Sequence, residues 1–170
     1  IAVNHALSDL FAMNAQAHSA LAIVTLPFAG ETIVERDLFQ IMSGALKVLN
    51  DNECTLMGGH TSEGAEMSLG FSVNGLAKPE QISRKNTPRV GDKLILTKAL
   101  GTGVLFAAHN QLQADGKWIE EAINSMLQSN RVSAEILHKH SLSACTDVTG
   151  FGLAGHLLEM LAQNKSKRSI

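Results

Sequence analysis

Hydrophobic positions along the first third of the chain change from helical to strand spacing and back. Within residues 6–14, apolar side chains recur at helical spacing, which predicts a short helix. Residues 19–28 are apolar, rich in β-branched side chains and close to a proline, which predicts a buried strand. A second helix is predicted from residue 32 to about residue 50, and Thr32 and Glu35 fit a capping box at its start.

Further strands and helices are predicted along the rest of the chain. Residues 54–57 form a short strand that leads into Gly58 and Gly59, and residues 66–77 alternate between apolar and polar positions. Beyond them, the pattern predicts strands at 93–97 and 143–146 and helices at 101–109, 117–128, 130–140 and 150–163. The expected fold class is α+β in the first half and a more helical α/β in the second.

The stretch from residue 78 to residue 92 separates these two halves. It contains Pro79 and Pro88, two of the three prolines in the chain, and prolines interrupt regular structure. We therefore expect an interdomain linker here, with an N-terminal domain over residues 1–85 and a C-terminal domain over residues 86–170.

Composition narrows the class of protein. Hydrophobic residues make up 45% of the chain and charged residues 18%, which is typical of a globular protein. A net charge of -2 gives no general attraction to nucleic acid or to an anionic membrane, and no apolar stretch approaches the length of a membrane helix. A phosphate-bearing ligand would therefore have to be held locally, by backbone N–H groups or by a metal ion.

The cysteines indicate the compartment, and the chain ends indicate that the protein is longer. Cys54 and Cys145 form no CxxC pair, so we expect free thiols in a reducing, cytoplasmic setting and neither a disulfide scaffold nor a zinc site. The chain begins without Met or a signal-peptide pattern and ends in the middle of a polar run. Both ends are therefore expected to be cuts through a longer protein.

The first candidate for chemistry is a polar set in the opening helix. Asn4, Ser8 and Asp9 lie among apolar residues. Burying a carboxylate is costly unless it is paired or binds a cation, so Asp9 is a candidate metal ligand. The alternative is that Ser8 or Asp9 caps the helix or lies at the surface.

The second candidate is the segment from Gly58 to His60. Two glycines after a strand let the backbone approach a ligand closely, and their N–H groups can hold a phosphate oxygen. His60 adds a side-chain donor. A plain hairpin connection to the next strand explains the same residues equally well.

The third candidate is the segment from Thr146 to Gly152. Asp147 follows a predicted strand and precedes a predicted helix, so it could cap that helix or direct a carboxylate at Mg²⁺. Magnesium prefers a few carboxylates together with phosphate oxygens and water, and Asp9 and Asp147 in separate segments would suit it. The histidines offer less: His138 is expected to be solvated, and His156 has no evident partner.

The order of the motifs is more specific than any one of them. "NHALSDLFAM", "LMGGHTSE", "GDKLILTKALGTGVL" and "ACTDVTGFGLAGHLLEM" follow one another along the chain. This succession closely resembles selenophosphate synthetase (selenide, water dikinase), a family within the aminoimidazole ribonucleotide synthase-like superfamily. The resemblance covers about residues 1–163, and TDVTGFG followed by GH and EM is its most specific part.

The resemblance implies a reaction and a site. Members of the family convert ATP, selenide and water to selenophosphate, AMP and orthophosphate, with several Mg²⁺ ions held by aspartates. Asp9 and Asp147 match two of these aspartates. Gly58, Gly59 and His60 match an ATP-contacting loop that is shared across a homodimer, and Asn4 lies in the same helix motif as Asp9.

The resemblance also implies an architecture and a departure from it. The family's N-terminal α+β halves pair into a barrel in the dimer, and each subunit adds a C-terminal α/β half. The reactive Cys or selenocysteine and its nearby Lys have no counterpart here, and Cys54 and Cys145 do not match that position. We therefore expect no catalytic nucleophile in this chain and no activity from residues 1–170 alone.

Two other functions remain open from the sequence. One is a different ATP-dependent kinase or ligase of the same superfamily, similar to thiamine monophosphate kinase. The other is a non-catalytic module that dimerises or binds a nucleotide. ATP and selenide or a selenium donor are the expected partners in the leading interpretation, with no nucleic acid and no membrane.

Overall fold

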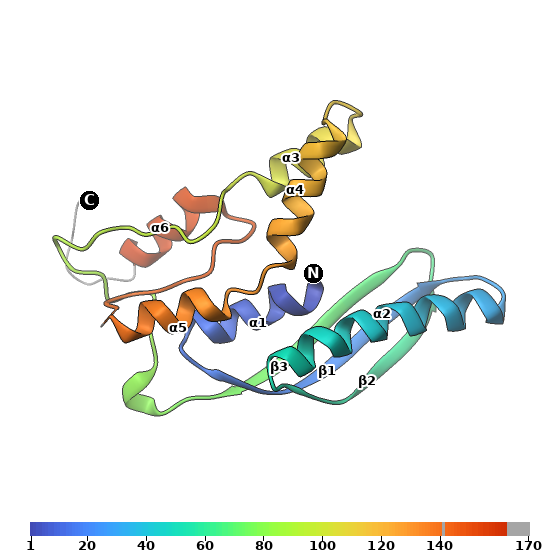
Figure 1. Ribbon diagram of the computed structural model, residues 1–170, viewed down its shortest axis with the longest axis horizontal. Helices are drawn as coiled ribbons and strands as arrows, with labels where there is room; N and C mark the ends of the chain where they lie inside the picture. Colours follow the sequence, from blue (N-terminus) through green and yellow to red (C-terminus); the bar gives the residue numbers. More distant parts are fainter. Residues whose placement is uncertain (141, 163–170) are drawn as a thin grey trace.

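The computed structural model describes residues 1–140 and 142–162 of the chain. A three-stranded sheet with one long helix extends to one side of Figure 1, and shorter helices gather on the other side. The elements, in order, are α1 (Ala2–Ala12), β1 (Gln16–Pro27), α2 (Glu31–Asp51), β2 (Thr55–Gly64), β3 (Ser68–Leu76), a 3-10 turn η1 (Pro79–Gln81), α3 (Thr102–Asn110), α4 (Gly116–Leu127), α5 (Arg131–Lys139) and α6 (Gly152–Ala162).

The sheet has the order β2-β1-β3. β1 runs parallel to β2, with Ser19 opposite Thr55, and antiparallel to β3, with Thr25 opposite Ser68. A parallel pair needs a long crossover connection, and α2 provides it between β1 and β2. β2 and β3 are therefore the two edge strands of the sheet that the described residues form.

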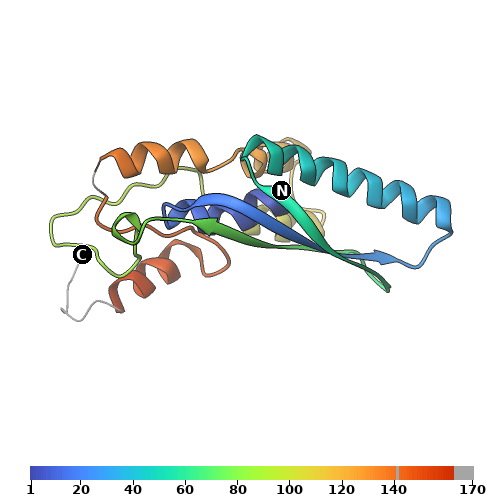
Figure 2. The ribbon, with the colours of Figure 1, turned by 90° about the horizontal axis from the view of Figure 1, so that it is seen from below.

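The core lies on one face of this sheet. Along β1 the buried residues are Ala17, Ala20, Ala22, Val24 and Leu26, and α1 and α2 cover them with side chains that include the fully buried Leu7 and Leu49. The opposite face of β1 carries Leu21 and Ile23, which are 43% and 56% exposed. Figure 2 shows α2 along one side of the strands, with no helix among the described residues opposite it.

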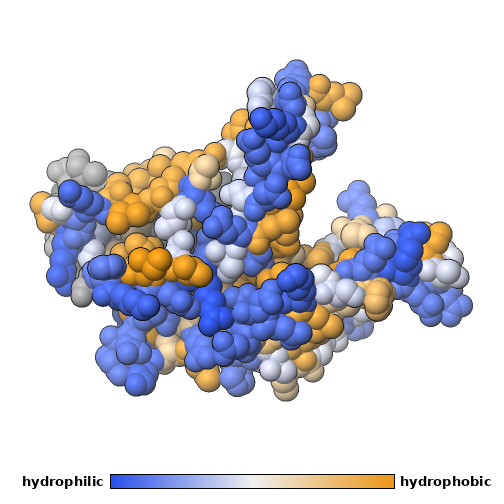
Figure 3. Space-filling view, in the orientation of Figure 1, coloured by the Kyte–Doolittle hydropathy of each residue, from blue (hydrophilic) through white to orange (hydrophobic). Residues whose placement is uncertain are grey.

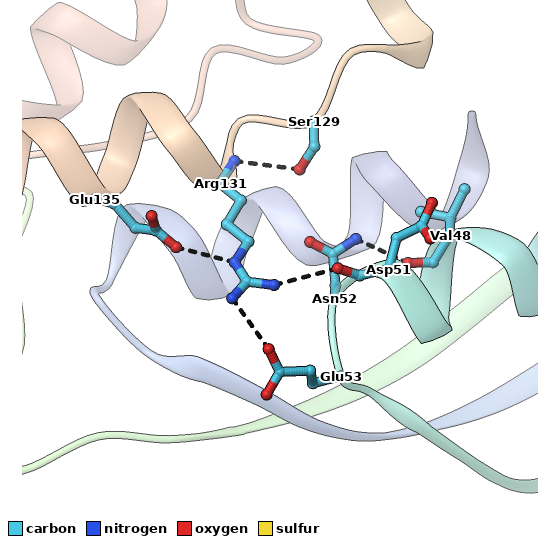
Figure 4. A network of polar contacts seen from close by, with 7 residues as sticks. All are labelled: Val48, Asp51, Asn52, Glu53, Ser129, Arg131 and Glu135. Carbon is cyan, nitrogen blue, oxygen red and sulfur yellow. Dashed lines mark hydrogen bonds and ion pairs between the residues drawn. The ribbon is translucent and has the colours of Figure 1, made fainter.

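A polar network joins the two halves of the chain. Arg131, at the start of α5, donates from Nε to Glu135 at 2.9 Å, from Nη1 to the Asp51 carbonyl at 3.2 Å and from Nη2 to Glu53 at 3.3 Å. Figure 4 shows the guanidinium lying between α5 and the turn that connects α2 to β2. Hydrogen bonds to both carboxylates raise the pKa of Arg131 further, so its charge is permanent.

A second junction lies at the C-terminal end of α1. His138 of α5 donates from Nε2 to the Phe11 carbonyl at 3.1 Å, and its Nδ1 lies 3.0 Å from the Ser83 hydroxyl. Ser83 also donates its backbone N–H to the Met13 carbonyl. The expectation of a solvated His138 was wrong, because this ring is half-buried and bridges α1, α5 and the linker.

The helix predictions are confirmed, with shifts at their ends. α1 begins four residues before the predicted start at residue 6, and α2 through α6 fall where helices were expected. The last predicted helical residue, 163, lies outside the described residues. The capping box was wrong: the N-cap of α2 is Gly30, no side chain caps it, and Thr32 lies inside the helix.

Two predicted strands are absent and one is longer than expected. Residues 93–97 and 143–146 adopt no strand, because a strand needs a neighbouring ladder and the described residues offer none. The segment around residue 145 makes one backbone bond to the linker, from the Cys145 N–H to the Arg84 carbonyl at 3.3 Å. The predicted strand at 54–57 continues through both glycines to Gly64.

The segment over residues 78–92, which we call the linker after its predicted role, is mostly irregular. Between residues 78 and 92 the only regular element is η1, a single turn over Pro79–Gln81. Within the described part of the chain, no helix is both long and apolar enough to cross a membrane.

Candidate functional site

Helix α1 presents two different polar faces. Asn4 and Ser8 are buried, and the Ser8 hydroxyl donates to the Asn4 carbonyl at 2.8 Å. His5 and Asp9 are also four residues apart, so they share a second face, which is exposed. The apolar residues between these faces attach α1 to the sheet and leave His5 and Asp9 available to a ligand.

This second face borders a cavity of about 830 Å³ between α1 and β3. Its walls are mostly apolar, and its polar side chains are those of His5 and Asp9. The lining residues are Ile1, Ala2, His5, Ala6, Asp9, Leu69, Gly70, Phe71, Val73 and Leu127. No Lys or Arg is among them, so an anionic ligand at this place needs a cation or backbone donors to neutralise it.

Asp147 comes from a distant part of the sequence to the same region. It is half-buried in the irregular segment before α6, and its carboxylate is close enough to Asp9 to act on it electrostatically. Partial burial raises the pKa of Asp9, the Asp147 charge raises this pKa further, and His5 lowers it. Two carboxylates that repel one another in this way form an arrangement that a bound cation stabilises.

The donor set fits a hard divalent cation bound together with a ligand. Magnesium in phosphate sites is commonly held by one or two carboxylates, with the remaining positions filled by phosphate oxygens and water. Asp9 and Asp147 are the two carboxylates that could take this part. Among residues 1–140 and 142–162, no three His, Cys, Asp or Glu side chains gather as an all-protein metal cage.

The alternative that Asp147 caps the following helix is excluded. α6 begins at Gly152, five residues further along the chain, so the Asp147 carboxylate is not placed at its N-cap. Gly152 has φ 65°, in the left-handed region that favours glycine. Asp147 therefore lies ahead of a turn that the glycine makes possible.

Gly58, Gly59 and His60 do not form the expected turn. They lie inside β2, where Gly59 is opposite Ala22 and His60 is opposite Ile23. A Cβ at Gly59 would lie 2.0 Å from the Ala22 carbonyl oxygen, so this glycine allows the two strands to approach. β1 separates β2 from β3, and none of the three residues lines the cavity beside Asp9.

Asn4 faces the second half of the chain and not the cavity. Its Nδ2 donates to the Leu127 carbonyl at 2.8 Å, and Asn130 of the following corner donates to Ser8 at 2.9 Å. The Asn4 Oδ1 is buried without a hydrogen-bond partner in the protein. These contacts attach α1 to the corner between α4 and α5.

The two cysteines are free and poorly suited to act as nucleophiles. Cys54 is buried and Cys145 is half-buried. Burial raises the pKa of both thiols, and the neighbouring Asp147 raises that of Cys145 further. Because the thiolate is the reactive form, neither side chain is activated for catalysis at neutral pH.

No pattern in the sequence singled out His156, which is buried in the structure. It is 7% exposed, and its Nε2 accepts from the Thr149 N–H at 3.1 Å. The sequence shows that His156 follows the TDVTGFG motif closely. It does not show the contact with Thr149, because a hydrogen bond from a turn to a helix seven residues later produces no periodic sequence pattern.

Comparison with known proteins assigns the chain to a family. Residues 1–77 match the family described as AIR synthase related protein, N-terminal domain, and residues 89–168 match the corresponding C-terminal domain. The two matches together span most of the chain, which therefore belongs to the AIR synthase related proteins. This assignment confirms the predicted fold class.

Within this class, the chain is similar to selenide, water dikinases. It is 41% identical over 160 residues to that of Trichlorobacter lovleyi, covering 94% of this chain and 46% of the relative. It is 39% identical over 159 residues to that of Aliarcobacter butzleri, with the same coverage of 94% and 46%. The resemblance drawn from the motifs is confirmed, and the chain spans about half the length of the curated relatives it matches.

Solved structures of lower identity share the fold. Thiamine-monophosphate kinase from Stenotrophomonas maltophilia K279a has a TM-score of 0.76 at 22% identity, covering 95% of this chain and 52% of its own. The hydrogenase maturation protein HypE has a TM-score of 0.76 at 19% identity, covering 96% and 51%. At these identities the likeness defines the fold alone.

Proposed function

We propose that the protein containing this chain transfers phosphoryl groups from ATP, with selenide as the acceptor and selenophosphate, AMP and orthophosphate as the products. The observation that supports this most directly is that Asp147 acts electrostatically on Asp9, which lines a cavity, in a chain about 40% identical to selenide, water dikinases. Phosphoryl transfer depends mainly on positioning and on charge neutralisation, and both can be supplied by carboxylates that recruit cations.

Asp9 and Asp147 are the proposed magnesium ligands. Mg²⁺ bound by them would neutralise the polyphosphate of ATP. α1 places Asp9 in the lining of the cavity, and the segment before α6 brings Asp147 close enough to Asp9 to act on it electrostatically. The apolar walls supplied by β3, including Phe71 and Val73, limit the access of water to that side of the ligand.

A homodimer would explain the position of the second motif. Gly58, Gly59 and His60 lie on an exposed edge strand, separated from the Asp9 region by β1. An unpaired edge readily accepts another strand, and the uncovered face of β1 adds the exposed Leu21 and Ile23. We propose that a second copy covers this surface and brings its β2 residues to the nucleotide.

Asn4 has a supporting role in this proposal. Its contact with Leu127 places α1 against the second half of the chain, which carries Asp147. The free, protonated thiols fit a cytoplasmic protein, in keeping with selenide as a reduced substrate. The nucleophile of the reaction is expected outside these 170 residues.

A related kinase is the second candidate function. One structure that shares the fold is AaThiL complexed with AMPPCP and TMP, with a TM-score of 0.66 at 17% identity over 91% of this chain and 50% of its own. The fold is thus compatible with an acceptor other than selenide. A kinase of that kind would release ADP, whereas the proposed reaction releases AMP.

The deciding measurement is the nucleotide product of the full-length protein. The complete protein is incubated anaerobically with ATP and Mg²⁺, with and without selenide, and the products are separated by chromatography. We expect AMP and orthophosphate only when selenide is present. ADP as the product, or AMP formation independent of selenide, would contradict the proposal and favour the related kinase. No turnover by an intact dimer would favour a binding module.

Asp147→Asn tests the proposed metal site in the same assay. The substitution removes a charge and preserves the shape of the side chain, so we expect loss of turnover without a fall in the melting temperature. Full activity of this variant would show that Asp147 is not a metal ligand. It would not affect the proposed reaction, which the product assay tests separately.

A further inference from the structure

The turn that follows Asp147 is tied to α6 by a buried histidine. The Nε2 of His156 accepts a hydrogen bond from the Thr149 N–H at 3.1 Å, and the Thr149 hydroxyl lies 3.2 Å from the same nitrogen. A backbone N–H can only donate, so this Nε2 carries no proton and the ring proton of the neutral imidazole is on Nδ1. The geometry thereby selects one tautomer of His156.

The other side of the ring faces a carboxylate. Glu159, one turn further along α6, has its Oε2 3.6 Å from Nδ1 of His156, which has no closer hydrogen-bond partner in the protein. Glu159 is itself paired with Lys85 of the linker, and this contact lowers the pKa of Glu159 below its usual value. Lys85, Glu159, His156 and Thr149 thus lie one after another, with hydrogen-bonded contacts at both ends and a separation of 3.6 Å between Glu159 and His156 that is longer than a hydrogen bond.

The glycines and the phenylalanine of the motif pack around this ring. The Phe151 ring lies against His156 with its centroid 5.6 Å away. A Cβ at Gly155 would come within 2.7 Å of the Phe151 Cβ, so glycine makes room for the phenylalanine. Gly152 is in the left-handed region of φ. Phe151, Gly152 and Gly155 thus allow the turn formed by the TDVTGFG motif to lie against His156.

We propose that His156 is a positioning residue, which holds the backbone at Thr149 and through it fixes the direction of the Asp147 carboxylate two residues earlier. Glu159 and Lys85 hold the ring in the required tautomer, as carboxylates orient imidazoles around metal sites. The contact between His156 and Thr149 stands on the structure alone. Its consequence for a bound cation rests on the proposed function.

The experiment compares three variants of the full-length protein. His156→Phe keeps an aromatic ring but removes the acceptor, and His156→Gln retains an acceptor near the Nε2 position. His109→Phe, on an exposed turn of α3, is the matched control. Each is also made together with Asp147→Asn. The first readout is native-state hydrogen exchange at the Thr149 amide. The second is the affinity for Mn²⁺ in the presence of AMPPCP.

We expect His156→Phe to accelerate exchange at Thr149 about tenfold, as the loss of one part-buried hydrogen bond would, with amides in α4 unchanged. Mn²⁺ affinity should fall about tenfold, as is common when a supporting residue is lost. This fall should disappear in the Asp147→Asn background, because the two residues act through one carboxylate. His156→Gln should recover most of both properties, and His109→Phe should change neither.

Unchanged exchange at Thr149 in His156→Phe would overturn the inference. It would also be overturned if Mn²⁺ affinity depended on Asp147 but not on His156. If exchange accelerates while Asp147→Asn leaves Mn²⁺ affinity unchanged, the positioning contact is supported and the metal role in the proposed function is contradicted. Should His156→Phe not fold, Glu159→Gln, at a partly exposed side chain, replaces it with the same readouts and the same expected directions.

Discussion

At the scale of single residues, the site depends on two carboxylates that repel one another. Asp9 is exposed, yet the surrounding protein removes part of its water and Asp147 adds a like charge. Both effects raise the pKa of Asp9, so its ionised form is less stable in the folded chain than in the unfolded chain. A cation bound between the two carboxylates would stabilise the ionised form of Asp9 in the folded chain.

This repulsion predicts the behaviour of Asp9→Asn in the full-length protein. Because the folded-state pKa of Asp9 is raised above 3.8, the wild-type protein loses stability as pH rises through the window just above that value. Without metal at pH 7, Asp9→Asn should therefore melt slightly higher than wild type. With Mg²⁺ and AMPPCP, wild type should gain thermal stability and Asp9→Asn should gain much less.

Differential scanning calorimetry at pH 4 and pH 7 checks both parts. The difference between variant and wild type should shrink at the lower pH, because a larger fraction of the Asp9 carboxyl is protonated there than at pH 7. Asp115→Asn is not a suitable control, because Asp115 caps α4 through the Lys117 N–H. Asp37→Asn, on α2, removes the same charge away from the cavity, together with one exposed pair with the neighbouring Arg36. A lower melting temperature for metal-free Asp9→Asn would contradict the argument.

At the scale of elements, β2 shows how a sequence motif can have a structural cause. Gly59 lies so close to β1 that a methyl group would overlap the Ala22 carbonyl. The glycine is required by the sheet, whatever else the strand contacts in the complete protein. The role of Gly59 in strand packing can be separated from a role in ligand contact, because stability and ligand binding are measured independently.

Gly59→Ala should destabilise the protein by about 1–3 kcal/mol, the usual cost of forcing a group into a packed region. Gly70→Ala is the matched strand control, since a Cβ there meets nothing within 4 Å. Denaturant unfolding of both variants measures the difference. Equal stability of the two variants would show that β1 and β2 can move apart to accommodate the methyl group. The glycine would then be required for ligand contact and not for strand packing.

The junction between α5 and the α2–β2 turn gives a second element-scale prediction. Arg131→Gln removes contacts with Glu53, Glu135 and the Asp51 carbonyl. Exposed ion pairs contribute little singly, so we expect a loss of about 1 kcal/mol for the network. Lys47→Gln, which breaks one exposed pair with Asp51, should cost about 0.3–0.5 kcal/mol or less. Urea unfolding compares them, and a smaller effect at Arg131 would contradict the network.

At the scale of the whole molecule, the uncovered surfaces are the dominant feature. The sheet has one open face, and hydrophobic side chains also reach the surface around α6 and residues 90–100, where Val90, Ile95 and Phe151 are 79%, 69% and 77% exposed. Figure 3 shows hydrophobic surface in this part of the molecule. Apolar area of this extent is typical of surfaces that other protein covers.

Ile23→Glu tests the open face of the sheet. If a second copy packs there in the full-length protein, the substitution would bury a carboxylate in the interface and weaken the dimer. The variant should therefore sediment as a monomer. Ile33→Glu is the control, because Ile33 is 46% exposed on α2, away from that face. Sedimentation velocity measures both. A dimer of unchanged affinity in Ile23→Glu would place the interface elsewhere.

The sequence determined the helices, the first strand and the identity of the candidate carboxylates. Helices could be predicted because their hydrogen bonds and apolar periodicity are local, as in the stripe of α2 that ends in the buried Leu49. Asp9 and Asp147 could be singled out because their chemistry and flanking motifs are local too. Their proximity could not be derived from spacing, since 138 residues separate them and only the packed chain brings them together.

The tertiary structure decided the features that depend on a distant partner. Residues 93–97 have the composition of a strand but no ladder to join among the described residues. Gly59 continues a strand because β1 lies beside it, and Asn4 faces α4 because Leu127 accepts its hydrogen bond. His156 became significant only once Thr149 was placed against it. In each case the deciding contact is non-local, and no periodicity of the chain encodes it.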